Sequence, residues 1–221
     1  MAEPVDDGIF REIDEELRNE QFSKLWKRYG NLLIAGVVAM VAGVGGFQAW
    51  KSYDLKERGR QGEQFAASLD LADGKDSQAA IDQLSRLAAD SGSGYAMLAG
   101  FQGAALLAKQ GDRTAAIAAY GMLATDTSLD AIYRDLAVIF SVTQQINAGG
   151  ADNGTLTALL APLSADDNPW RHSARELLGV LAVSSGDTAK AQELFKALSK
   201  DPTAPQGIRQ RAGEMLSAGI G

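Results

Sequence analysis

The sequence has no cysteine and only one histidine, His172, among its 221 residues. Without cysteine the chain forms no disulfide and supplies no thiolate to a reaction or a metal. One imidazole without a second histidine does not make a zinc site, so we interpret His172 as a surface or helix-capping residue. We expect no metal and no cofactor, and the chain is compatible with either side of a membrane.

Positive charge and catalytic patterns are also scarce. Residues 61–221 carry 12 lysines and arginines against 18 aspartates and glutamates. An acidic surface repels phosphate, and no basic stripe with interleaved aromatics offsets it, which argues against nucleic acid as a partner. Asp166 and Asp167 stand just before Pro169, a pattern typical of a loop and not of an acid-base pair. The sequence therefore predicts a protein that is not an enzyme and has no small-molecule substrate.

Charge is absent altogether from 22 consecutive residues, Tyr29 to Trp50. As a helix rising ~1.5 Å per residue, this run reaches roughly 33 Å, enough to cross a hydrocarbon core of about 30 Å. We expect a head over 1–28, a transmembrane helix over 29–50, a juxtamembrane connector over 51–62 and a soluble domain over 63–221. The alternative is a cleaved signal peptide, for which Val44 and Gly46 offer a weak small-residue cleavage pattern.

Both ends of the uncharged run carry residues typical of a membrane interface. Indole and phenol rings prefer the headgroup layer, and basic side chains bind anionic headgroups of the lipid bilayer. We expect this role for Lys24, Trp26, Lys27, Arg28, Tyr29, Trp50 and Lys51. The paired aromatics and the long acidic head favour a retained anchor over a cleaved signal. Flanking basic residues are slightly denser on the head side, which favours a cytoplasmic head and a translocated domain.

The head and the span each show a face on the predicted helix. The apolar residues of the head recur at spacings of three and four: Ile9, Phe10, Ile13 and Leu17. This amphipathic helix either binds the interface or a partner, or is a solvated lead-in to the span. Within the span Ala35, Ala39 and Gly43 share one side. Small residues let helices approach closely in lipid, so they predict a packing face.

Beyond the span the apolar periodicity is helical, and glycine-aspartate pairs such as Gly111-Asp112 and Gly186-Asp187 mark the turns. Glycine takes the left-handed conformation that ends one helix, and aspartate accepts the free amides of the next. Self-comparison gives a unit of about 36 residues, with a degenerate copy over about 132–166 that has a short second helix containing Pro162. Expected packing positions of the repeats are Ala80, Ala116, Tyr120, Gly179, Ala191 and Phe195.

The clearest copy of the unit resembles the tetratricopeptide repeat. Its matching residues are Leu178-Gly179, Ala191, Phe195 and Pro202. The resemblance implies stacked hairpins with a long groove for an extended peptide or a partner helix. Five aromatics are expected in the packed core or along this groove: Tyr95, Phe101, Tyr120, Tyr133 and Phe140. The fold class we expect is all-α, with an N-terminal amphipathic helix, one transmembrane helix and an α-solenoid of tetratricopeptide-like hairpins.

The whole layout resembles the ancillary Sec-translocon subunit family of bacterial inner membranes. A short charged head leads through Tyr29-Gly30-Asn31 into a glycine-rich span closed by Trp50, and a tetratricopeptide-like domain follows. The resemblance implies a single-pass inner-membrane protein with a cytoplasmic N-terminus and a periplasmic domain. The partners it implies are the Sec translocon, a membrane-anchored periplasmic chaperone and emerging secretory chains.

Two functions follow from this layout. The first is a non-enzymatic membrane-anchored adaptor or holdase that binds the chaperone or emerging chains through its repeat domain. The second is a structural scaffold of an envelope complex, for division or outer-membrane assembly, which does not bind unfolded clients. Binding of an unfolded secretory chain separates the two.

Overall fold

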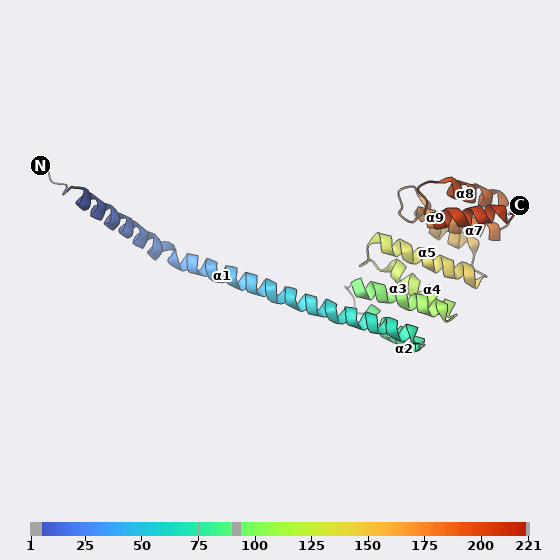
Figure 1. The fold of residues 1–221 in the computed structure, drawn as a ribbon, viewed down its shortest axis with the longest axis horizontal. Coiled ribbons are helices and arrows are strands. Elements are labelled where there is room, and N and C mark those ends of the chain that lie inside the picture. The colour runs from blue at the N-terminus through green and yellow to red at the C-terminus, as the bar shows by residue number, and fades with distance from the viewer. Residues whose placement is uncertain (1–5, 75, 90–93, 220–221) are drawn as a thin grey trace. The chain divides into compact units, whose positions relative to one another are not determined.

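The protein is described here by a computed structural model, which covers residues 6–74, 76–89 and 94–219, with side chains from residue 23 onward except Leu25. The described part is all helical, as the sequence predicts, with nine α-helices, one short 3-10 helix and no strand. Figure 1 shows these helices in chain order. The chain divides into two compact units, residues 1–57 and 58–221.

The described residues of the first unit lie within α1 (Asp6–Asp73), which contains the described part of the predicted head and the whole predicted span. The sequence predicts an amphipathic helix in the head and a transmembrane helix after it, and in the structure the two form one continuous helix. No proline falls within α1, so nothing interrupts its backbone hydrogen bonding. An apolar stretch in the Trp26–Asp73 part, with a mean hydropathy of 2.0, is long enough to cross a membrane and is fully exposed in the isolated chain. The side chains of the head stripe, Ile9 to Leu17, lie outside the described residues.

The second unit is an array of helical hairpins. The end of α1 packs against α2 (Ser77–Ala88), and further hairpins are formed by α3 (Gly94–Lys109) with α4 (Arg113–Thr125), α5 (Ala131–Ala148) with α6 (Asn153–Leu160), and α7 (Arg171–Ser184) with α8 (Thr188–Lys200). A last helix, α9 (Gln206–Ser217), packs on α8. The third hairpin has the short second helix that the sequence predicts, and Pro162 begins a 3-10 helix after α6 (η1, Pro162–Ser164).

The turns inside two of the hairpins use glycine and aspartate in the way that the sequence predicts. Gly111 and Gly186 have positive φ angles of 90° and 75°, which a residue without Cβ adopts at little cost. Asp112 then accepts the amide of Ala115 at 3.0 Å, and Asp187 accepts the amide of Lys190 at 3.0 Å. Aspartates at the starts of α2 and α6, Asp76 and Asp152, do the same. The second helix of every described hairpin therefore begins at an aspartate cap.

The core of the second unit consists of three apolar clusters in succession. The first joins the end of α1 to α2 and α3, the second joins α5, α6, η1 and α7, and the third joins α7, α8 and α9. Polar links add to this packing between successive hairpins. The Trp170 indole N–H donates to the Ile132 carbonyl at 2.7 Å, and the Asn168 amide donates to Asp135 at 2.9 Å.

Candidate functional site

Aromatic and basic side chains at the two ends of the predicted span are exposed on α1. Trp26, Tyr29 and Trp50 are exposed, and the guanidinium of Arg28 lies 5.7 Å from the centre of the Tyr29 ring. Lys24, Lys27 and Lys51 are exposed at the two ends of the run. Exposed aromatic and basic side chains are the kinds that a headgroup layer accommodates, and their role as interface anchors stays a proposal.

The small residues of the span are also uncovered. Ala35, Ala39 and Gly43 are exposed, and a Cβ added at Gly43 would meet nothing within 4 Å. Nothing in the described part of the first unit fills this face. A second helix could therefore approach it closely, and that assignment also remains a proposal.

The positions expected to pack the repeats lie inside the second unit. Ala80, Ala116, Ala191 and Phe195 are fully buried, and Tyr120 is nearly so. Burial also raises the pKa of the Tyr120 phenol. Gly179 is the tightest of these sites, because a Cβ there would lie 2.7 Å from the Phe195 ring. The ring occupies the space that a side chain on α7 would need.

The five aromatics divide between the core and a surface cavity. Phe101, Tyr120 and Phe140 form one cluster that links α3, α4 and α5, with ring centres 5.4 to 6.2 Å apart. Tyr95 packs on Phe65 of α1 with ring centres 6.1 Å apart. Tyr133 lines a cavity at the start of α5. The first four belong to helix packing, and Tyr133 belongs to a candidate binding surface.

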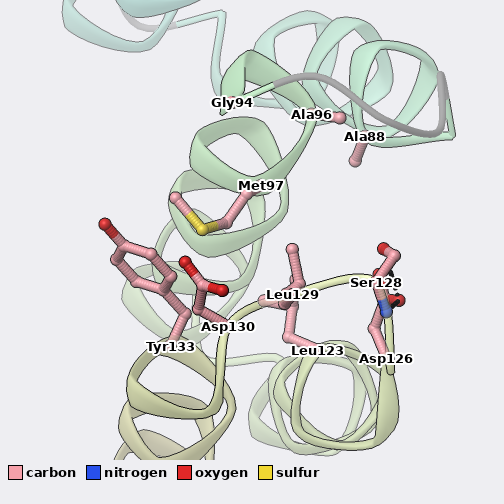
Figure 2. Close-up of a pocket in the computed structure, with 10 residues that line it drawn as sticks. All are labelled: Ala88, Gly94, Ala96, Met97, Leu123, Asp126, Ser128, Leu129, Asp130 and Tyr133. Atoms are coloured by element: carbon pink, nitrogen blue, oxygen red, sulfur yellow. Dashed lines mark hydrogen bonds between the residues drawn. The ribbon is translucent and has the colours of Figure 1, made fainter.

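That cavity has a volume of about 420 Å³ and lies where the end of α2 meets the starts of α3 and α5 (Figure 2). Ala88 comes from α2, Met97 from α3 and Leu123 from α4, and Asp130 and Tyr133 come from the start of α5. In Figure 2 the carboxylate of Asp130 points toward Met97. The cavity is therefore walled by residues of four consecutive helices, α2 to α5, and of the loop before α5.

A second cavity of about 320 Å³ adjoins the first. The two share Ala88, Leu123 and Asp126, so they are neighbouring parts of one groove. The second part runs between α2 and α4, over small residues of α3 that include Gly100 and Gly103, and it ends beside Met122. We name the whole surface, formed by the residues around these two cavities, the Met122 groove.

The Met122 groove carries negative charge from Asp126, which lines both cavities, and from Asp130 in the first cavity. Ser128 donates its backbone N–H and its hydroxyl to Asp126, at 2.8 and 2.7 Å, and these bonds lower the pKa of the Asp126 carboxyl. Asp130 precedes α5, but its side chain makes no capping hydrogen bond. Arg134 lies close by and donates to the Leu129 carbonyl. Both carboxylates therefore line the groove beside its apolar residues.

Sequence reasoning expected a groove in the repeat domain and named Tyr133 among its possible lining residues, but it did not locate this surface. Its walls come from four helices, and apolar periodicity within one helix does not say which helices meet. One signal was present, because the stretch between Arg113 and Asp126 contains no charged residue. A helix without a charged face is usually covered on all sides, yet Met122 on this helix is 69% exposed.

The interpretation of His172 as a surface or capping residue is wrong. Its side chain lies under the loop after α8, and only 6% of the residue is exposed. Nδ1 lies 3.6 Å from Asp201 without a hydrogen bond, and Nε2 lies 3.4 Å from the Thr203 hydroxyl. Burial lowers the pKa of His172, and Arg171 lowers it further. The covering loop follows about 30 residues later in the sequence, where local spacing could not reveal it.

Two acidic groups outside the groove, Asp166 and Asp152, have structural partners. Asp166 pairs with Arg175 at 2.5 Å, and this contact lowers the pKa of the Asp166 carboxyl. Asp152 accepts the amide and the hydroxyl of Thr155 at the start of α6. Among the described residues, no three His, Asp or Glu side chains gather in a way that could hold a metal ion. The groove is therefore the strongest candidate for a functional surface.

Comparison with known families supports the repeat architecture. The model of the tetratricopeptide repeat-like domain matches residues 23–211, from the region before the span to α9. No curated protein matches the chain. The match covers most of the sequence and includes all the hairpins described above. The chain belongs to the tetratricopeptide repeat-like domain family.

Proposed function

We propose that this protein is a non-enzymatic, membrane-anchored adaptor or holdase associated with the Sec translocon. Its repeat domain binds a membrane-anchored chaperone or emerging secretory chains. The family supports the coarser part of this proposal, since tetratricopeptide-like arrays typically bind proteins and are typically not enzymes. The layout of head, span and repeat domain, which resembles the ancillary translocon subunits, supports the finer part.

The single observation that carries the proposal is the combination of two uncovered apolar surfaces in one chain. One is the uncharged run of α1, which is long enough to cross a membrane and is exposed except at Gly30. The other is the Met122 groove in the repeat domain. A protein with both surfaces can hold a partner close to a bilayer. We place the anchor in the bacterial inner membrane, with a cytoplasmic head and a periplasmic repeat domain.

Photo-crosslinking in intact cells tests the proposal. A photoreactive residue is placed at Trp26 in the head, at Ala39 in the span and at Met122 in the groove of the full-length chain. The proposal predicts crosslinks from the first two positions to translocon subunits. It predicts crosslinks from Met122 to the chaperone or to a secretory chain arrested during export.

The result also separates the two functions. Crosslinks to envelope-assembly or division proteins, with none to the translocon or to a secretory chain, would replace the adaptor with the scaffold. The matched control is a photoreactive residue at Leu159 of α6, which is 42% exposed but lies outside the groove.

A further inference from the structure

We infer that the Met122 groove binds extended polypeptide segments in which apolar side chains lie next to a lysine or arginine. The inference rests on the proposed function, because it names the chemistry of the chain that the repeat domain would hold. It concerns the surface between α2, α4 and the start of α5. The packed aromatic cluster of Phe101, Tyr120 and Phe140 takes no part in it.

The apolar part of the groove is unusually accessible. Met122 is 69% exposed, more than any other large apolar side chain in the described part of residues 58–219. Met97 lies at the other part of the groove. Methionine is unbranched and polarizable, so it adapts to apolar side chains of different shapes. Two methionines at the walls therefore suit a binder of many sequences.

The floor of the groove consists of small residues of α3. Ala99, Gly100, Gly103 and Ala104 line it, with Ala99 and Ala104 buried beneath the surface. The two cavity volumes, about 420 and 320 Å³, fall in the range of roughly 300–1,000 Å³ that is usual for binding pockets. Each part can thus receive side chains from an extended segment while the segment continues along the groove.

Charge selects among apolar segments. The lining carries two carboxylates, Asp126 and Asp130, and no lysine or arginine. At the starts of α2, α4, α6 and α8 the aspartate binds a backbone amide, but Asp130 makes no such bond. Its carboxylate is therefore available to a cation. The charge of Arg134 contributes to the lowered pKa of Asp126, and its guanidinium donates a hydrogen bond to the Leu129 carbonyl.

The test uses the full-length chain in nanodiscs of zwitterionic lipid, with empty nanodiscs as a background. Three fluorescent peptides have equal length and the same apolar residues, which are flanked by lysine, by glutamine or by glutamate. Fluorescence anisotropy measures their affinities. We expect the lysine peptide to bind at least about threefold more tightly than the glutamate peptide, and the preference to weaken at high salt.

Matched variants locate the binding. Asp130→Asn keeps a good helix-capping residue and should remove much of the preference for the lysine peptide, whereas Asp167→Asn, an exposed position outside the groove, should not. Met122→Gln should weaken binding of all three peptides by about tenfold, because it removes an apolar contact. Leu159→Gln makes the equivalent change outside the groove and should have no effect. Circular dichroism verifies that each variant is folded.

Two results would overturn the inference. One is equal affinity for the lysine and glutamate peptides, or no binding of any. The other is an equal loss of affinity in Met122→Gln and Leu159→Gln. Crosslinks from the head and the span to the translocon would persist in either case, so the failure of this inference is distinguishable from failure of the proposed function.

Discussion

Contact between one glycine and one aromatic ring controls the approach of α7 and α8. A Cβ at Gly179 would lie 2.7 Å from a carbon of the fully buried Phe195 ring, which is too rigid to yield easily. We expect Gly179→Ala to lower the free energy of unfolding by about 1–3 kcal/mol, as overpacked cores do. Urea unfolding followed by circular dichroism measures the change.

The matched control for this substitution is Gly121→Ala on α4, where nothing lies within 4 Å of the added methyl group. There the higher helix propensity of alanine should raise the stability by up to about 1 kcal/mol. Equal effects at the two positions would show that the Phe195 ring does not restrict α7.

Buried His172 makes the stability of the chain depend on pH. Burial lowers its pKa from the ordinary 6.5, with a further contribution from Arg171 and an opposing one from Asp201. The unfolded chain therefore takes up the proton more readily, so this contribution is complete above about pH 6.5 and is lost as the pH falls through the lowered value. Comparing urea midpoints at about pH 7.5 and pH 5.5 should show the loss.

Replacing the imidazole tests the origin of this dependence. In His172→Leu the group that titrates is gone, so the urea midpoint should change less between the two pH values. An unchanged pH dependence in the variant would assign the effect to other groups. The neighbouring carboxylates Asp166 and Asp201 would not account for it, because their lowered pKa values keep them ionised at both pH values.

Single residues were predictable where the cause is local. The left-handed glycines and the aspartates after them could be read from the sequence, since a turn between two helices needs both features within a few positions. The burial of His172 could not, because the loop that covers it is set by the stacking of α7 on α8. The sequence also could not show that Asp130 makes no capping hydrogen bond, since aspartates do cap the second helices of the hairpins.

Helix starts are the best test at the scale of the element. Asp112 and Asp187 each accept a backbone amide at 3.0 Å, and Asp130 accepts none. Replacing either of the first two with alanine should cost about 1 kcal/mol of stability. Asp130→Ala should cost less, and equal losses at all three positions would contradict the role of the bonds. Thermal unfolding of the three variants makes the comparison.

The uncovered small face of the span gives a second prediction at this scale. Replacing Ala39 and Gly43 with leucine fills the space that a neighbouring helix would need, so a membrane partner should co-purify in detergent at a lower yield. The control replaces Val37 and Val41 with leucine, on the other side of the same helix. Unchanged yields with the first pair would remove the packing face.

The sequence predicted most of the helices, but it did not predict which helices pack against one another. Helical periodicity and the turn signals predicted the hairpins, including the short second helix of the third one. Pro162 was expected inside that helix but begins η1 after it. The head and the span were expected as two helices, but the absence of proline makes them parts of α1. The Met122 groove depends on how α2, α4 and α5 stack around α3, and a pattern confined to one helix carries no information about that stacking.

At the scale of the whole molecule the retained anchor is the central expectation. If α1 is not cleaved, the chain of 221 residues should appear in the membrane fraction with its mass of 23.3 kDa. An epitope placed before the span should remain attached to the repeat domain. Alkaline extraction, which removes peripheral proteins, should leave the chain in the pellet. A shorter soluble product without the epitope would establish a cleaved signal peptide instead.

Because the second unit has three separate apolar clusters, one end of the array can unfold without the other. The cluster of α7, α8 and α9 contains Phe195 and Leu198, and it shares no residue with the cluster of α1, α2 and α3. Stability in such arrays is a sum over neighbouring repeats, so the last hairpin can fray while the earlier ones stay folded. A destabilising substitution in α8 or α9 would then make the end of the array sensitive to proteases. Binding in the Met122 groove would persist, since the groove is formed by the earlier helices.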